Sequence, residues 1–144
     1  SQFHAVDISN DAVEVARMNA LFYGLENVVH VYQSDLFEAI EDSEEFDVIV
    51  ANLPYIGEVE NRYVSEDTEK YEPNGALFGG HTGVELYKKM FQEIKDKTVG
   101  FKLLLGEFGF GQTLEMEALL NTFFDQRWRI EKDLAGIDRI FIVT

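Results

Sequence analysis

Four residues in the middle of the chain combine the groups needed to hold a planar nitrogen. Asn52, Leu53, Pro54 and Tyr55 follow directly after the apolar run 46–51, so they stand where a buried strand ends. The Asn52 amide offers an acceptor oxygen, and a residue before proline is held extended, which lets the Leu53 carbonyl point outward. The Tyr55 ring offers a face for stacking. The motif indicates a site for an amide or amine nitrogen, although an ordinary proline turn fits the four residues equally well.

Other short motifs surround this one. They are Val6-Asp7-Ile8-Ser9 and Gln33-Ser34-Asp35-Leu36-Phe37 before it, and Glu72-Pro73, Ala76-Leu77-Phe78-Gly79-Gly80, Gly83-Val84-Glu85-Leu86-Tyr87, Gly106-Glu107-Phe108-Gly109 with Gln112, and Asp133-Leu134-Ala135-Gly136-Ile137-Asp138-Arg139 after it. In this order and at these spacings the chain resembles the HemK/PrmC family, the protein-(glutamine-N5) methyltransferases of peptide chain release factors. The resemblance covers nearly the whole chain, with Leu53 standing where the family's Asn-Pro-Pro-Tyr motif most often has its first proline.

Length and composition predict one globular domain. The chain has 144 residues, 46% of them apolar and 13% aromatic, which is enough to build a substantial core. It has no cysteine, which excludes disulfides and thiolate chemistry, and no apolar run of membrane-spanning length. We therefore expect a cytoplasmic protein without a membrane partner; the oligomeric state stays open.

The charge bears on the class of partner. A formal net charge of −15 opposes binding to a polyanion, because Lys and Arg side chains that neutralise phosphates supply most nonspecific nucleic-acid affinity. Direct DNA binding is therefore not expected. A merely soluble acidic surface accounts for the charge as well.

The apolar periodicity predicts strands that alternate with helices. Strands are expected at 3–6, 28–32, 46–51 and 99–105, with edge strands at 128–130 and 139–143 that are antiparallel; helices are expected from Ser9 or Asn10 to Tyr23, at 36–40, after Thr82 with Val84, Tyr87, Phe91 and Ile94 on one face, and around Leu114, Ala118, Leu119 and Phe123. The stretch 57–80 is expected to be a long loop. This order predicts an α/β, Rossmann-like fold over residues 1–144, a mostly parallel sheet with helices on both faces and ligands at the carboxyl ends of the strands.

Acidic residues at strand ends are the candidates for cofactor binding. Asp7 ends a strand where a carboxylate accepts hydrogen bonds from both hydroxyls of an adenosyl ribose, while capping of the next helix is its structural alternative. The resemblance implies S-adenosylmethionine as the cofactor, held by Asp7, Ile8, Asp35, Leu36 and Asn52, with Asp35 facing the adenine amino group and Leu36 packing beside the ring. We expect 46–51 at the centre of the sheet, and Asp7 and Asn52 in one cleft. His4, His30 and His81 lack metal-ligand spacing, so no metal site is predicted.

The start of the chain departs from the family pattern. The family carries a Gly-rich turn about 20 residues before the first acidic residue, whereas only six residues precede Asp7 here. We therefore expect an N-terminally truncated methyltransferase domain that lacks the central first strand, the Gly-rich turn and the upstream substrate-recognition domain.

The resemblance implies catalytic roles for Asn52, Leu53, Pro54 and Tyr55 in methylating a glutamine in the Gly-Gly-Gln loop of a release factor. The acidic segment 58–72 then contacts a basic protein surface, and stacking rather than the Tyr55 hydroxyl carries the aromatic role. Two alternatives stay open. One is a nucleic-acid methyltransferase acting on an exocyclic amine, which should carry a basic channel; the other is an inert fragment or binding module with the same fold.

Overall fold

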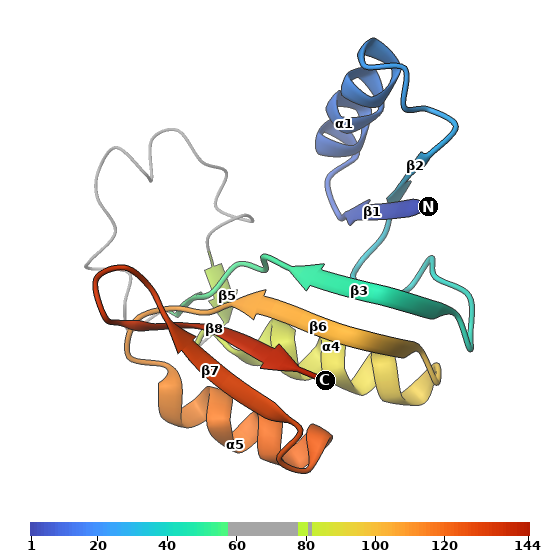
Figure 1. The fold of residues 1–144 in the computed structure, drawn as a ribbon. Helices are drawn as coiled ribbons and strands as arrows, with labels where there is room; N and C mark the ends of the chain where they lie inside the picture. Colours follow the sequence, from blue (N-terminus) through green and yellow to red (C-terminus); the bar gives the residue numbers. More distant parts are fainter. Residues whose placement is uncertain (58–77, 81) are drawn as a thin grey trace. The chain divides into compact units, whose positions relative to one another are not determined.

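Residues 1–57, 78–80 and 82–144 are described by the computed structural model of the chain (Figure 1). They divide into two compact units, residues 1–42 and residues 43–144. Each unit is described by itself below. The acidic segment 58–72 and His81 lie outside the described residues.

The first unit is one strand-helix-strand motif. Strand β1 (Phe3–Asp7) pairs in parallel with β2 (Val29–Gln33), and helix α1 (Asn10–Phe22) connects them (Figure 1). Ser9 precedes the helix in an extended conformation, and its hydroxyl accepts from the Ala12 amide at 3.4 Å. Such capping satisfies an amide that has no partner within the helix. The predicted strands, helix and cap are confirmed.

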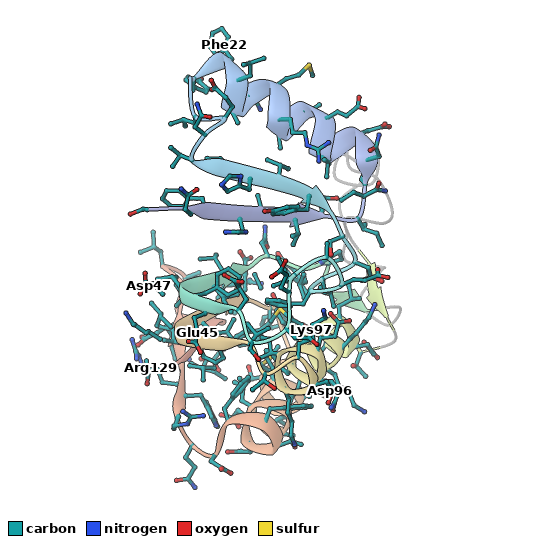
Figure 2. The ribbon with its side chains drawn as sticks, turned by 90° about the vertical axis from the view of Figure 1, so that its right-hand side faces the viewer. Phe22, Glu45, Asp47, Asp96, Lys97 and Arg129 are labelled. Carbon is teal, nitrogen blue, oxygen red and sulfur yellow. The ribbon has the colours of Figure 1, made fainter. Side chains whose placement is uncertain are left out.

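Helix α1 has two apolar faces. Val13 and Ala20 are buried, whereas Met18 and Phe22 lie on the opposite side and are 61% and 81% exposed. Figure 2 shows the Phe22 side chain pointing outward at the end of the helix. Packing of α1 on the β1–β2 pair therefore accounts for only one of its two apolar faces.

The helix expected at 36–40 is wrong, since these residues form turns. The buried Ser34 hydroxyl is the physical reason, because it donates to the Leu36 carbonyl at 3.0 Å and accepts from the Ala39 amide at 2.9 Å. A side chain that bonds the local backbone in this way competes with helix formation. Leu36 adopts a positive φ of 52°.

The second unit contains a four-stranded sheet in the order β3-β6-β8-β7. The strands are β3 (Glu45–Ala51), β6 (Gly100–Glu107), β8 (Asp138–Val143) and β7 (Trp128–Lys132), and a small parallel pair joins β4 (Ile56–Gly57) to β5 (Phe78–Gly80). β3 and β6 are parallel, while β8 runs antiparallel to both β6 and β7. The predicted antiparallel edge is confirmed.

The expected central position of 46–51 is wrong for the described strands. β3 lies at the edge of its sheet and pairs only with β6 among them. Val48 and Val50 are 50% and 72% exposed although they belong to an apolar strand. This pattern is typical of a strand that is built to be covered on both faces.

Two helices of the described part of the second unit, α4 (Glu85–Asp96) and α5 (Thr113–Phe124), cover the same face of the sheet (Figure 1). The Phe91 ring of α4 lies 5.6 Å from Phe141 of β8 and 4.8 Å from Phe124 of α5, with edge-to-face geometry at both contacts. Such aromatic contacts stabilise a core beyond simple burial. The hydrophobic core of this unit is therefore between the sheet and these two helices.

Two details of these helices differ from expectation. Thr82 does not cap α4; the Glu85 carboxylate instead accepts from the Thr82 and Gly83 amides, at 2.8 and 2.9 Å. Hydrogen bonds from Thr82 and Gly83 hold the pKa of Glu85 below its usual value, although its partial burial opposes this. In α5 the buried side chains are Met116, Leu120 and Phe124, whereas Leu114 is 77% exposed. The predicted helix is confirmed, and of the four residues named for it Leu119 and Phe123 are half-buried. The most deeply buried row lies one position further along the helix.

The Asp133–Gly136 turn of the family motif closes the β7–β8 hairpin. Asp133 Oδ1 accepts from the amides of Ala135 and Ile137, at 2.9 and 3.0 Å, and Gly136 has a φ of +80°. These backbone hydrogen bonds, with the nearby Arg139 guanidinium, hold the pKa of Asp133 below its usual value. The motif is thus structural.

The lowered pKa of Asp133 predicts a dependence of stability on pH. A carboxylate whose pKa is depressed in the folded state stabilises that state above its unfolded pKa of about 3.9, and the contribution disappears as the pH falls through the folded value. We expect Asp133→Asn to lower the free energy of unfolding at pH 7. Denaturant titrations at pH 7 and at about pH 3 check this, since a gap of equal size at both would contradict it.

Candidate active site

The four-residue motif lies at the carboxyl end of β3, as predicted. β3 ends at Ala51, and residues 52–55 have no regular secondary structure. The Asn52 side chain is exposed, whereas Leu53, Pro54 and Tyr55 are half-buried. The amide oxygen of Asn52 is therefore open to a ligand while the turn behind it is packed.

Tyr87 of α4 connects this turn to the sheet. Its hydroxyl donates to the Glu107 carbonyl in a short hydrogen bond and lies 3.4 Å from the Ala51 carbonyl oxygen. The Leu53 amide approaches the same hydroxyl at 3.5 Å. Burial raises the pKa of Tyr87 above its ordinary value, so the hydroxyl keeps its proton at neutral pH. The side chain thus joins the carboxyl ends of β3 and β6.

The Leu53 amide bears on the departure from the family motif. A proline at position 53 would have no N–H, whereas Leu53 has one and directs it at Tyr87. The contact is long, so it contributes little energy by itself. It is a contact that a proline at this position could not make.

Gln112, the residue before α5, fixes the other end of the turn. Its side chain is 3% exposed; Nε2 donates to the Tyr55 carbonyl, and Oε1 accepts from the Gly109 amide at 2.8 Å. A buried amide that is satisfied at both ends favours a single conformation of the groups it bonds. The sequence indicated Gln112 only as a member of the motif that begins at Gly106.

Gly83 lies against the same carbonyl group. Its φ is +85°, and a Cβ built there would lie 2.1 Å from the Tyr55 oxygen and 2.2 Å from Gln112 Nε2. No side chain fits this space without moving the turn. Glycine is required here by both conformation and contact.

The Tyr55 ring is held at its tip. Its hydroxyl donates to Glu107 Oε1 at 3.0 Å. The sequence predicts stacking for Tyr55 and no role for its hydroxyl. It indicates Glu107 only as a member of the motif Gly106-Glu107-Phe108-Gly109. Residues 52–55 are thus contacted from α4, β6 and the start of α5.

The cofactor candidates of the first unit gather at one edge of its sheet. Asp7 ends β1 and Ile8 follows it, Asp35 and Leu36 come after β2, and the Ser34 amide donates to the Asp7 carbonyl at 2.9 Å. Asp7 Oδ1 accepts from the Ser9 amide at 2.8 Å, so the capping alternative holds for one carboxylate oxygen. A carboxylate has a second oxygen with which to bind hydroxyls.

Leu36 is strained at this edge. A β-carbon makes positive φ unfavourable, and a non-glycine residue in that region indicates structure that over-determines it. Here the hydrogen bond from the buried Ser34 hydroxyl to the Leu36 carbonyl holds Leu36 in this conformation. Asp35 and Leu36 are both half-buried, which suits side chains that border a ligand.

The two groups of candidates belong to separate units. Asp7, Ile8, Asp35 and Leu36 lie in residues 1–42, and Asn52 to Tyr55 lie in residues 43–144. That Asp7 and Asn52 line one cleft stays a prediction.

A shallow hollow of about 320 Å³ also lies in the first unit, between α1 and β2. It is lined by residues that include Arg17, Glu26 and His30, and it contains none of the cofactor candidates. The Arg17 guanidinium donates to the Val31 carbonyl at 2.8 Å, so its charge already covers the edge of β2. The hollow is thus a feature of this edge and not of the strand ends.

In the described part of the chain no three His, Cys, Asp or Glu side chains are grouped to hold a metal ion. Among the same residues no helix is long and apolar enough to cross a membrane.

Comparison with known proteins bears on the site and the fold. Residues 1–66 match the family UPF0020, described as an RMKL-like methyltransferase domain. The release factor glutamine methyltransferase of Koribacter versatilis is 33% identical over 96% of this chain and 48% of that protein, and the one of Enterococcus faecalis is 32% identical over 96% and 49%. The resemblance to the HemK/PrmC family is confirmed. The chain spans about half the length of these relatives.

Solved structures confirm the fold class. The hMettl16 catalytic domain superposes with a TM-score of 0.69 at 13% identity, over 99% of this chain and 55% of that one. The ribosomal protein L11 methylase of Lactobacillus delbrueckii gives 0.61 at 16% identity, over 100% and 57%. The chain has the methyltransferase fold of these proteins and covers just over half of each of them.

The contact of Gly83 with the turn predicts the effect of a side chain there. Gly83→Ala should lower the free energy of unfolding by more than about 2 kcal/mol, because it combines a positive-φ penalty with a clash on the Tyr55 carbonyl. Gly136→Ala is the matched control, since its φ is +80° and nothing lies within 4 Å of the added carbon. It should cost only about 1 kcal/mol. Equal losses in denaturant titrations would show that the close approach has no energetic weight.

Proposed function

We propose that the chain is the catalytic part of an S-adenosylmethionine-dependent methyltransferase that modifies a glutamine side-chain amide in a peptide chain release factor. The observation that carries the proposal is the turn 52–55, which presents an exposed Asn52 side chain on a backbone fixed from three elements. The names of relatives that are 32–33% identical along nearly the whole chain support it.

The strand ends of the first unit fit an adenosyl group. Asp7 supplies a carboxylate oxygen for ribose hydroxyls, Asp35 accepts from an adenine amino group, and Leu36 and Ile8 give apolar contact; Asn52 borders the methyl end. Ile8 is 65% exposed, so its side chain is accessible for apolar contact with a ligand. The cofactor supplies a methyl group on a positively charged sulfur.

The protein's contribution to transfer is alignment and charge stabilisation. An amide nitrogen is a poor nucleophile because its lone pair is delocalised into the carbonyl. Asn52 Oδ1 and the Leu53 carbonyl accept from the two N–H bonds, which localises the lone pair and stabilises the positive charge that develops on nitrogen. Tyr55 stacks on the amide plane, and Pro54 limits the turn. The methylated nitrogen loses its proton afterwards, so no strong base is needed.

We infer a protein acceptor rather than a nucleic acid. With a formal net charge of −15, the chain attracts basic surfaces and repels phosphates. The glutamine of a release factor's Gly-Gly-Gln loop presents the planar amide that this turn would hold.

Asn52→Ala tests the role of the acceptor oxygen. In the gene product that carries this sequence, the variant should lower the rate of release-factor methylation by about 100-fold or more, because one preformed acceptor at a charged transition state has that effect. Affinity for S-adenosylmethionine should change far less. Transfer of labelled methyl and calorimetric titration of the cofactor measure the two quantities.

Asn121→Ala is the control for this variant. It removes another side-chain amide of the same unit, one that only accepts from Trp128 Nε1 at 3.1 Å. Methylation should continue at the normal rate in this protein. A normal rate in Asn52→Ala as well would sink the proposed role.

The 144 residues alone should bind S-adenosylmethionine weakly or not at all. Asp7, Asp35 and Asn52 serve the ribose, adenine and acceptor sides of the pocket, whereas the backbone amides expected to face the methionine part belong to the Gly-rich turn that this chain lacks. Calorimetry on the 144 residues checks this expectation. Micromolar binding would show that these side chains suffice without that turn.

A further inference from the structure

We propose that Glu107 is a positioning residue for methyl transfer: its carboxylate holds the Tyr55 ring in the plane that the acceptor amide must meet. The proposal rests on the proposed function of the turn 52–55. It assigns a role to a side chain outside the four-residue motif 52–55. The carrying observation is the 3.0 Å hydrogen bond from the Tyr55 hydroxyl to Glu107 Oε1.

Tyr55 is restrained at both ends. Gln112 Nε2 bonds its backbone carbonyl, and Glu107 bonds its hydroxyl. Fixing the backbone and the hydroxyl oxygen sets the axis of the ring. Because a phenol O–H prefers to lie in the ring plane, a carboxylate in a fixed place also favours one orientation of that plane. Stacking on a flat amide depends on that plane, and a ring ordered beforehand spares the acceptor the entropy of ordering it.

The place of Glu107 in the sheet explains why it can do this. Ala51 pairs with Gly106 in the parallel β3–β6 ladder, so Glu107, the last residue of β6, lies at the level of Asn52, the first residue after β3. Its backbone carbonyl accepts from Tyr87, and its carboxylate accepts from Tyr55. One residue thus contacts both tyrosines of the site.

A carboxylate suits this position better than a neutral acceptor. An ionised carboxylate only accepts, so the Tyr55 hydroxyl must donate, and charge-assisted hydrogen bonds are about twice as strong as neutral ones. Donation also enriches the ring in electrons. The face of an electron-rich ring attracts the positive charge that grows on the acceptor nitrogen. No Lys or Arg forms an ion pair with Glu107 among the residues described here.

The hydrogen bond between Tyr55 and Glu107 can be detected without measuring methyl transfer. NMR on the 144-residue chain with 13C at the tyrosine Cζ position reports the hydrogen bonding of each phenol, and the signal lost in Tyr55→Phe identifies Tyr55. Glu107→Ala should shift that signal. Thr113→Val should leave it in place, because it removes a different hydroxyl–carboxylate contact of the same unit, Thr113 to Asp138 at 3.3 Å.

The effect of the Tyr55–Glu107 hydrogen bond on methyl transfer is measured in the gene product that carries this sequence. Glu107→Ala and Tyr55→Phe should each lower kcat/KM for a release factor by about tenfold, with unchanged affinity for S-adenosylmethionine. The double variant should be no worse than the weaker single variant, because both remove one shared interaction. Glu107→Gln keeps an acceptor oxygen and should recover most of the loss, and Thr113→Val should behave as the wild type.

The outcomes separate the two proposals. Normal transfer in Glu107→Ala, losses that add in the double variant, or an unmoved Tyr55 signal would overturn the positioning role and leave the proposed function standing. An inactive wild type would overturn the proposed function and the positioning role with it, while a shifted Tyr55 signal would still establish the hydrogen bond.

Discussion

The parallel ladder between β3 and β6 is the constraint on which the candidate site depends. Parallel neighbours end at the same side of a sheet, and Ala51 with Gly106 is the last pair of the β3–β6 ladder. Asn52 and Glu107 are therefore the first residues beyond the ladder. A shift of this register by one residue would turn one of the two side chains to the other face of the sheet. The apolar residues of β6 that pack under α4 and α5 thus also decide which polar groups meet at its end.

Gly106 lets the helix reach those strand ends. A Cβ there would lie 2.4 Å from the Phe141 ring and 3.1 Å from Tyr87. Because Gly106 has no Cβ, the Tyr87 and Phe141 rings can pack edge to face with their centroids 5.1 Å apart. This contact places the Tyr87 hydroxyl beneath the carbonyls of Ala51 and Glu107. The aromatic core and the polar site are consequently one construction, in which a fully buried ring ends in the hydroxyl that joins two strands.

Local patterns were enough to predict most elements. Apolar runs located β3 and β6, and the serine before α1 predicted its cap, because these signals depend on neighbours in sequence. Failures occurred where two local readings competed. The pattern of residues 36–40 predicts a helix, whereas the buried Ser34 hydroxyl bonds Leu36 and Ala39 and holds them in turns. Such a hydrogen bond has no periodic signal in the sequence. In α5 two apolar rows lie next to one another, and Phe91 contacts Phe123 of one row and Phe124 of the other. The depth at which each row is buried is therefore set by packing and not by the sequence pattern.

The candidate site divides along the same line. Asn52 and Tyr55 were predictable because their types and order are the chemistry itself, whereas Gln112 and Glu107 contact the turn from 57 and 52 residues away in sequence. Polar side chains at such positions look like ordinary turn and strand-end residues until the fold brings them to the turn. Burying Gln112 demands that both ends of its amide find partners, and few backbone conformations of residues 53–55 provide them. The cost of a misplaced polar group thus selects one shape for the turn, which gives the exposed Asn52 a fixed base.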